Sequence, residues 1–169
     1  MPVLGLHCSH EQIHPRALLA AVQQAEAAGF DAAMSSDHFS PWSSRQGHSA
    51  FAWSWLGAAL QATSLPFGVV NAPGQRYHPA IIAQAIATLG AMYPGRFWAA
   101  LGSGEASNEH ITGGRWPRKD VRTARLRDAA SLLRDRDPGA VLPWALAALA
   151  ASLGESDDRV GATEAIDEL

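Results

Sequence analysis

The arrangement of apolar segments along the chain constrains its fold more than any other feature. Four short β-compatible segments alternate with four segments whose apolar residues have helical spacing. The expected strands are residues 3–6, 30–36, 65–72 and 94–102. The expected helices are residues 15–28, 51–63, 79–93 and 117–135. This βαβαβαβα order, with short connections after each helix, predicts an α/β fold of about four parallel strands joined by right-handed crossovers.

Polar loops follow the expected strands and not the helices. Three of these loops cover residues 37–49, 73–78 and 102–116. Such asymmetry is typical of a TIM barrel, in which the chemistry takes place at the C-terminal ends of the strands. A doubly wound open sheet shares this asymmetry, so periodicity alone does not choose between the two folds.

Composition limits the class of protein. The chain has 169 residues, 47% of them hydrophobic and 17% charged, which is typical of a folded domain with one core. A net charge of −3 gives no basic surface for nucleic acid or anionic lipid. Cys8 is the only cysteine, and no signal peptide or membrane segment is recognisable, so we expect a cytoplasmic protein.

The sequence changes character after Asp135. Residues 135–169 lack a strand signal, and Ala and Leu dominate their middle. We expect an apolar helix from about Pro143 to Leu153, ended by Gly154, and a short acidic helix near the C-terminus. The chain is therefore divided into a βα region, residues 1–134, and a divergent helical tail.

His38 is the first candidate for chemistry, because it follows the expected second strand and stands beside the carboxylate of Asp37. An imidazole in this position can act as a general base near neutral pH. A histidine that merely caps the loop is an equally good interpretation. Trp42 can form an apolar wall for a flat ring, although packing within the loop is the commoner role of a Trp.

A second candidate segment, residues 102–105, follows the expected fourth strand. Gly104 would let the backbone approach a ligand closely, and Glu105 would project into the barrel mouth as an acid. A plain tight turn is the more common explanation, and the segment lacks the third glycine of a dinucleotide fingerprint. Other polar residues on the same presumed face, which solvated loop positions would explain equally well, are Glu11, Asn108 and Glu109.

Several other chemistries are disfavoured by the sequence. His7, His10 and His14 match no established zinc spacing and have no accompanying Cys pair, so no metal site is predicted. Cys8 is interpreted as a small buried side chain. The sequence contains no G-x-S-x-G elbow and no P-loop.

Four short sequence segments, taken together, resemble one known family. They are Ser9 to Gln12, Ser36 to Trp42 (SDHFSPW), Arg76 to Ala80 (RYHPA) and Gly102 to Glu109 (GSGEASNE). In this order and spacing, residues 3–134 are similar to the luciferase-like monooxygenase superfamily, in particular its branch of deazaflavin-dependent glucose-6-phosphate dehydrogenases.

The resemblance implies a TIM barrel with the cofactor at the strand C-termini. His38 would take a proton from the substrate while hydride passes to or from the cofactor ring, Trp42 would stabilise developing charge, and Glu105 would be the acid. The residues implied to bind the cofactor are Asp37, Glu11, Val69, Val70, Gly104 and Asn108. The resemblance also implies a non-proline cis peptide near Val69-Val70, at a cost of about 3–4 kcal/mol.

FMN is the cofactor expected from the resemblance, with the deazaflavin coenzyme F420 as the alternative, because residues 45–47 and 51–68 resemble members regarded as flavin users. A complete barrel has eight strands and about 250 residues, and in the family the second half holds the cofactor phosphate. We therefore expect residues 1–134 to form a partial barrel, and 135–169 to be the product of a frameshift or truncation.

Two functions remain open from the sequence. The first is a flavin- or deazaflavin-dependent oxidoreductase that acts on a small-molecule substrate. The second is a catalytically silent half-barrel that acts only through association, or not at all. Unpaired strand edges predict that the chain forms homo-oligomers.

Overall fold

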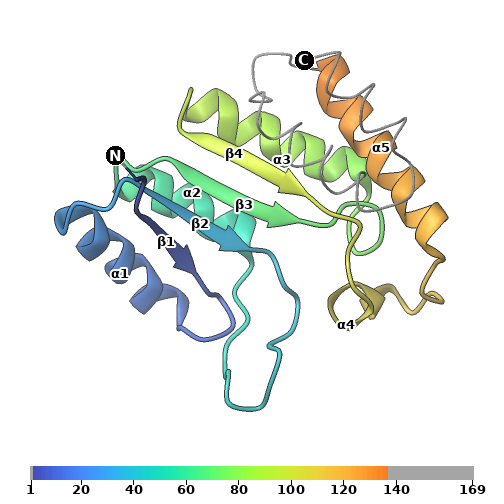
Figure 1. Cartoon of the computed structure of the whole chain (residues 1–169), viewed down its shortest axis with the longest axis horizontal. Coiled ribbons are helices and arrows are strands. Elements are labelled where there is room, and N and C mark those ends of the chain that lie inside the picture. The colour runs from blue at the N-terminus through green and yellow to red at the C-terminus, as the bar shows by residue number, and fades with distance from the viewer. Residues whose placement is uncertain (1, 137–169) are drawn as a thin grey trace. The chain divides into compact units, whose positions relative to one another are not determined.

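The computed structural model describes residues 2–136, in which strands and helices alternate (Figure 1). The strands are β1 (Gly5–Cys8), β2 (Ala32–Ser36), β3 (Phe67–Asn71) and β4 (Phe97–Leu101). The α-helices are α1 (Pro15–Ala27), α2 (Ala52–Ala62), α3 (Pro79–Met92), α4 (Ala106–Glu109) and α5 (Lys119–Arg136). The two helices expected in the tail lie outside the described residues.

The strands form one sheet in the order β1-β2-β3-β4, and the predicted α/β fold with four parallel strands is confirmed. Cys8 is in register with Ser35, and Ser36 is in register with Val70. The first strand was predicted at residues 3–6 and begins later, at Gly5, because its pairing with β2 starts there.

The described residues form two compact units. The first unit consists of the described residues up to Val70 and of Leu89–Phe97, and therefore holds β1, α1, β2, α2 and most of β3. The second consists of Asn71–Thr88 and the described residues from Trp98 onward, and therefore holds most of α3 and β4, together with α4 and α5.

Helix α1 packs its apolar face against β1 and α2 in the first unit. Leu18 and Val22, one turn apart, are buried on this face. The helix ends as the sequence predicts: Gly29 takes a left-handed conformation (φ 87°), and the N–H of Phe30 then donates to the carbonyl of Ala25 at 3.0 Å. This is the hydrogen bond of a Schellman motif, which satisfies a carbonyl that the helix leaves unpaired.

Arg96 joins the C-terminal end of α2 to the start of β3. One nitrogen of its guanidinium, Nη2, donates to three backbone carbonyls, those of Leu60 (3.0 Å), Thr63 (2.6 Å) and Leu65 (3.1 Å). Carbonyls at a helix C-terminus have no intrahelical donor, and a cation favours the negative end of the helix dipole. Arg96 therefore caps α2, while its own carbonyl accepts from the N–H of Phe67 at 2.7 Å.

Burial differs between neighbouring residues of β3 and of β4. In β3 the side chain of Val69 is fully buried, whereas that of Val70 is 40% exposed. In β4 Phe97 and Ala99 are buried, and the residue between them, Trp98, is only partly buried. Val70 in β3 and Trp98 in β4 are therefore more open than their neighbours in these two strands.

The cis peptide predicted near Val69-Val70 is wrong. The described residues contain no cis peptide bond, and both residues continue β3 in regular parallel pairing with β2. A trans peptide at a non-proline residue is more stable by about 3–4 kcal/mol, so the regular strand is the lower-energy arrangement.

The loop predicted at residues 102–116 contains short helical structure. Helix α4 is followed by a 3-10 turn, η1 (His110–Thr112), which ends at Gly113 with φ 74°. Elements of three or four residues are too short to show helical periodicity, so no sequence pattern predicts them. Among residues 2–136, no helix has the length and apolar character needed to cross a membrane.

Candidate active site

The carboxylate of Glu11 is the centre of a hydrogen-bonded cluster in the first unit. It is buried just beyond β1, and it accepts hydrogen bonds from the hydroxyls of Ser9 (2.7 Å) and Ser36 (3.0 Å). Its Oε1 lies 2.5 Å from Nδ1 of His38. Burial by itself would raise the pKa of Glu11, but the hydrogen bonds from Ser9, its own backbone, His38 and Ser36 outweigh burial and bring the pKa below its ordinary value. Glu11 is therefore ionised at neutral pH.

The contact with Glu11 determines which ring nitrogen of His38 carries a proton. A separation of 2.5 Å from an ionised carboxylate requires a proton between the two atoms, so Nδ1 donates to Glu11. The indole N–H of Trp42 also lies 3.2 Å from Nδ1, but a protonated ring nitrogen has no lone pair with which to accept it. In the neutral imidazole, Nε2 of His38 then carries the lone pair and can act as a base toward a ligand.

Trp42 flanks the imidazole of His38. The two rings meet edge to face, with centroids 5.1 Å apart and an interplanar angle of 82°. Trp42 is 61% exposed, and its backbone N–H is held by the side chain of Gln46 at 2.7 Å. Phe39 is exposed in the same loop. The wall for a flat ring that the sequence suggested at Trp42 is thus an exposed aromatic surface beside His38.

Asp37 is buried, and its carboxylate accepts a hydrogen bond from the indole N–H of Trp53 at 2.9 Å. Its backbone N–H donates to the carbonyl of Val70 at 3.1 Å, which extends the β2–β3 pairing by one residue. These two contacts fix the backbone immediately before His38. The cofactor contact implied for Asp37 stays a prediction.

Val69 and Val70, both implied to bind the cofactor, differ in what they can offer to a ligand. The side chain of Val69 is fully buried, so only its backbone could take part. Val70 lies on the partly open face of β3 and offers side-chain surface.

The remaining predicted residues form a group in the second unit. Asn108 donates from its amide to the carboxylate of Glu105 at 2.7 Å, directly after β4. Gly104 adopts φ 76°, and a Cβ there would lie 3.1 Å from both Ala72 Cβ and Glu109 Cγ. The loop is therefore packed closely around Gly104, and a Cβ there would have to displace Ala72 or Glu109 by a few tenths of an ångström.

Glu109 pairs with Arg76, also in the second unit. The guanidinium Nη2 lies 3.5 Å from Oε1 of Glu109, and the backbone N–H of Arg76 donates to Oε2 at 3.2 Å. Both side chains are nearly fully buried. Glu109 therefore joins the β3–α3 loop to α4, which is a more specific role than the solvated position considered from the sequence.

Sequence reasoning missed several partners of the predicted residues. Ser9 and Ser36 stand within the family-like strings, but nothing in the sequence indicated that both hydroxyls bind one carboxylate. Trp53 is one of several aromatic residues in an apolar helix, and no local signal pairs it with Asp37.

The histidines near β1 have separate surroundings. His10 is 1% exposed and packs edge to face on Trp55, with ring centroids 4.9 Å apart, and burial lowers its pKa. His14 accepts the backbone N–H of Arg16 at the start of α1. In the part of the chain that the structure describes, no group of three or more His, Cys, Asp or Glu side chains is arranged to hold a metal ion.

Parallel βα units with polar side chains after the strands define an α/β protein of the barrel type, and a carboxylate–imidazole pair is typical of acid–base chemistry. Comparison with known proteins gives the family. The chain belongs to the luciferase-like monooxygenase family, whose model matches residues 3–136.

Curated relatives include F420-dependent glucose-6-phosphate dehydrogenases. The chain is 47% identical over 136 residues to the enzyme of Mycolicibacterium fortuitum and 47% identical over 135 residues to enzyme 1 of Rhodococcus jostii. In each case the match covers 78% of this chain and 40% of the relative. The chain thus spans about 40% of the length of these relatives.

Solved structures share the fold. An F420-dependent secondary alcohol dehydrogenase, in complex with an F420–acetone adduct, superposes with a TM-score of 0.74 at 43% identity, over 79% of this chain and 42% of that one. An FMN complex of a type II Baeyer–Villiger monooxygenase from Pseudomonas putida has a TM-score of 0.60 at 21% identity, over 78% of this chain and 38% of that one. At 21% identity the likeness concerns the fold alone.

Proposed function

We propose that this chain contributes the base of an F420-dependent dehydrogenase that oxidises a carbinol group to a carbonyl. Relatives at 43–47% identity are named as F420-dependent dehydrogenases of glucose 6-phosphate or of secondary alcohols, and both substrates present a C–OH carbon that can lose hydride. This support favours coenzyme F420 over FMN, the cofactor expected first from the sequence.

The pairing of Glu11 with His38 carries the proposal. A buried, ionised carboxylate that binds Nδ1 fixes the tautomer and the orientation of the imidazole, and it stabilises the imidazolium that forms when Nε2 accepts a proton. A histidine that merely caps the loop would need neither the buried carboxylate nor the hydroxyls of Ser9 and Ser36.

The surroundings of His38 fit a planar, largely apolar ring. Trp42 and Phe39 expose aromatic surface in the loop that carries His38, and Val70 exposes an aliphatic side chain on the open face of β3. Flat rings are held mainly by such apolar contacts, with a few polar groups that fix orientation. When bound, coenzyme F420 would accept the hydride.

The chain's own residues would then perform the proton transfer. Nε2 of His38 takes the hydroxyl proton of the substrate as the C–H hydride leaves and the carbonyl forms. Glu11 keeps its proton-accepting contact with Nδ1 throughout, so the positive charge on the ring is neutralised locally. Glu105, held by Asn108, is proposed as the acid because the GSGE string resembles the family pattern.

Cofactor titration tests the proposal. The full chain is titrated with coenzyme F420 and, separately, with FMN, and binding is followed by fluorescence. We expect saturable binding of F420, and its slow reduction when isopropanol or glucose 6-phosphate is added. His38→Asn should retain binding but lose the reduction, whereas His48→Asn, a change in the same loop, should retain both.

Two results would contradict the proposal. If FMN bound saturably and F420 did not, the cofactor would be FMN, as first expected from the sequence. Binding of neither would favour the second candidate, a silent half-barrel. Self-association through open strand edges stays a prediction, and size-exclusion chromatography of the same sample tests it.

A further inference from the structure

We propose that the second unit holds a separate binding site for the oxyanion group of a small polar molecule, such as a carboxylate or a phosphate. The site is a cavity of about 650 Å³ between the β3–α3 loop, the segment after η1, and α5. It shares no residue with the Glu11–His38 cluster or with the Glu105–Asn108 pair.

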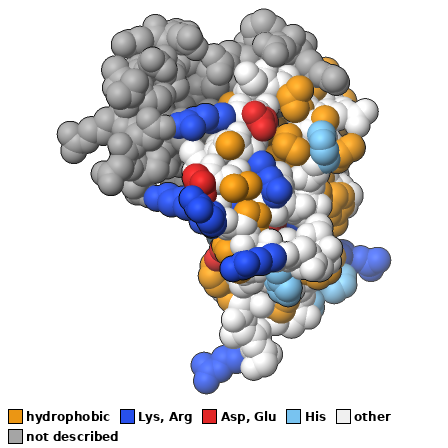
Figure 2. Space-filling view, turned by 90° about the vertical axis from the view of Figure 1, so that its right-hand side faces the viewer, with side chains coloured by type: hydrophobic (Ala, Val, Ile, Leu, Met, Phe, Trp, Pro, Cys, Tyr) orange, Lys and Arg blue, Asp and Glu red, His pale blue; other side chains and the backbone are white. Residues whose placement is uncertain are grey.

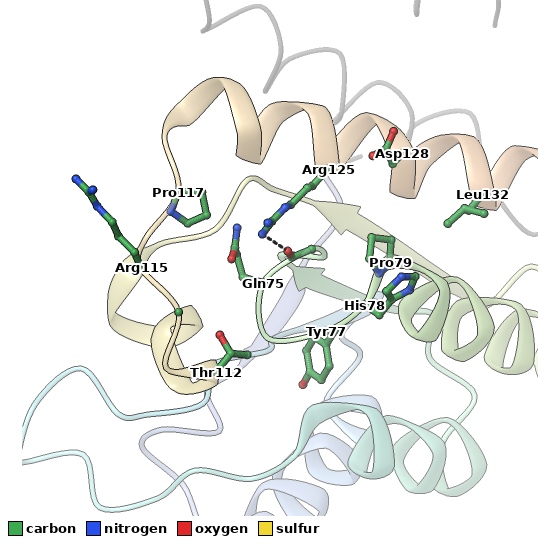
Figure 3. A pocket seen from close by; sticks show the side chains of 12 residues that line it. Gln75, Tyr77, His78, Pro79, Thr112, Arg115, Pro117, Arg125, Asp128 and Leu132 are labelled. Carbon is green, nitrogen blue, oxygen red and sulfur yellow. Dashed lines mark hydrogen bonds between the residues drawn. The ribbon is translucent and has the colours of Figure 1, made fainter.

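Arg125 is the fixed cation of this cavity. Its Nη1 donates to the carbonyl of Gly74 at 2.7 Å, and its stem lies so close to Gly74 that a Cβ at that position would be 2.8 Å from Arg125 Cβ. Figure 3 shows the side chain extending from α5 toward the loop that carries Gly74. The guanidinium is therefore held in place by one hydrogen bond, and its remaining N–H groups have no partner among the described residues. A pre-organised guanidinium binds carboxylate and phosphate with little loss of side-chain entropy.

Neutral donors line the same cavity. Nε2 of Gln75 is buried and has no hydrogen-bond partner among residues 2–136, and Figure 3 shows Gln75 beside Arg125. A buried amide N–H without a partner is costly, so a ligand oxygen that accepts it gains affinity. Nδ1 of His78 accepts the N–H of Ala80 at 3.2 Å, which makes Nε2 the donor atom of that ring.

The charge of the lining also favours an anion. Arg115 also lines the cavity, although Figure 3 shows its side chain extending away from Arg125, and Asp128 is the carboxylate among the 12 lining residues. Lys and Arg side chains are scattered over the face of the molecule on the α5 side (Figure 2). An oxyanion can accept from the guanidinium of Arg125 and the neighbouring amide of Gln75 together, whereas a cation or an apolar molecule would leave these donors unpaired.

Calorimetric titration of the full chain tests this site. Inorganic phosphate and sodium acetate are the probes, and sodium chloride at matched ionic strength is the reference. We expect saturable binding of phosphate or acetate at one site beyond any effect of chloride, and the tighter probe identifies the preferred oxyanion. Arg125→Met and Gln75→Leu should each weaken binding by about tenfold or more, as expected for the loss of a hydrogen bond to a charged group.

Arg118→Met is the matched control, because it removes an exposed positive charge of the same unit outside the cavity. It should bind the probe as the wild type does. Circular dichroism confirms that each variant folds, and if Arg125→Met does not fold, Gln75→Leu decides the question. The site is refuted if neither oxyanion binds beyond the chloride reference, or if the cavity variants bind as tightly as Arg118→Met.

Discussion

Glu11 Oε1 lies 2.5 Å from Nδ1 of His38, although the two residues are 27 positions apart in the chain. The parallel register of β1 and β2, which pairs Cys8 with Ser35, brings the ends of these strands together. A carboxylate just beyond one strand then meets an imidazole just beyond the next.

Glu11→Gln should lower kcat for cofactor reduction by about 100-fold or more, because an amide does not stabilise the imidazolium form of His38. Cofactor affinity should change less than kcat. Steady-state kinetics with F420 measures both. Ser9→Ala removes one hydroxyl and leaves the ion pair in place, so its effect should be clearly smaller, and equal effects of the two substitutions would contradict the assigned role.

Stability should depend on pH through Glu11. Its folded-state pKa lies below the ordinary value of 4.5, so the ionised form stabilises the fold. This contribution is fully present above pH 4.5 and is lost as the pH falls through the folded-state pKa. Urea unfolding from pH 7 to pH 3 should therefore show that wild type loses more stability than Glu11→Gln over the acidic part of the range. Parallel curves for the two proteins would exclude this linkage.

Arg96→Met should destabilise the chain by about 2–4 kcal/mol, because three carbonyls near the end of α2 would lose a charged donor. Urea denaturation measures the change in the free energy of unfolding. Arg118→Met removes a cation from an exposed pair with Asp120 and should leave stability unchanged within error. If both variants unfolded at the same urea concentration, Arg96 would not be the cap described above.

Cys8 should be unreactive in the native protein. Its side chain is fully buried, and burial raises the pKa of the thiol to about 12, so almost no thiolate exists at pH 8. Labelling with a thiol-specific chromogenic reagent should be slow in buffer and fast in urea. Because the sequence contains a single cysteine, the whole signal comes from this residue. Rapid labelling without denaturant would show that the region around β1 opens readily.

Gly104→Ala should destabilise the chain more than Gly113→Ala. Both glycines have positive φ, 76° and 74°, which costs a residue with a side chain about 1–2 kcal/mol. A Cβ at position 104 would in addition meet Ala72 and Glu109 at 3.1 Å, whereas position 113 has nothing within 4 Å. Thermal or urea unfolding of the two variants measures their losses of stability, and the difference between the losses is the steric contribution at position 104. Equal losses would argue against close packing of the loop around Gly104.

The fold was largely predictable because its signals are local. The spacing of Leu18 and Val22 and the stop at Gly29 identify α1 without reference to the rest of the chain. Short elements without periodicity, such as α4, were not predicted. The cis peptide expected near Val69-Val70 was inferred from resemblance alone, and the regular pairing of β3 corrects it.

The candidate site was predictable only in part. The sequence by itself identified Asp37, His38 and Trp42, because contiguous polar and aromatic residues after a strand indicate a functional loop. Only the tertiary structure decided that Glu11 binds His38, that Trp53 donates to Asp37, and that Arg76 pairs with Glu109. The physical reason is that periodicity arises from neighbouring residues, whereas partners across strands and loops are set by parallel register and burial, which no single segment encodes.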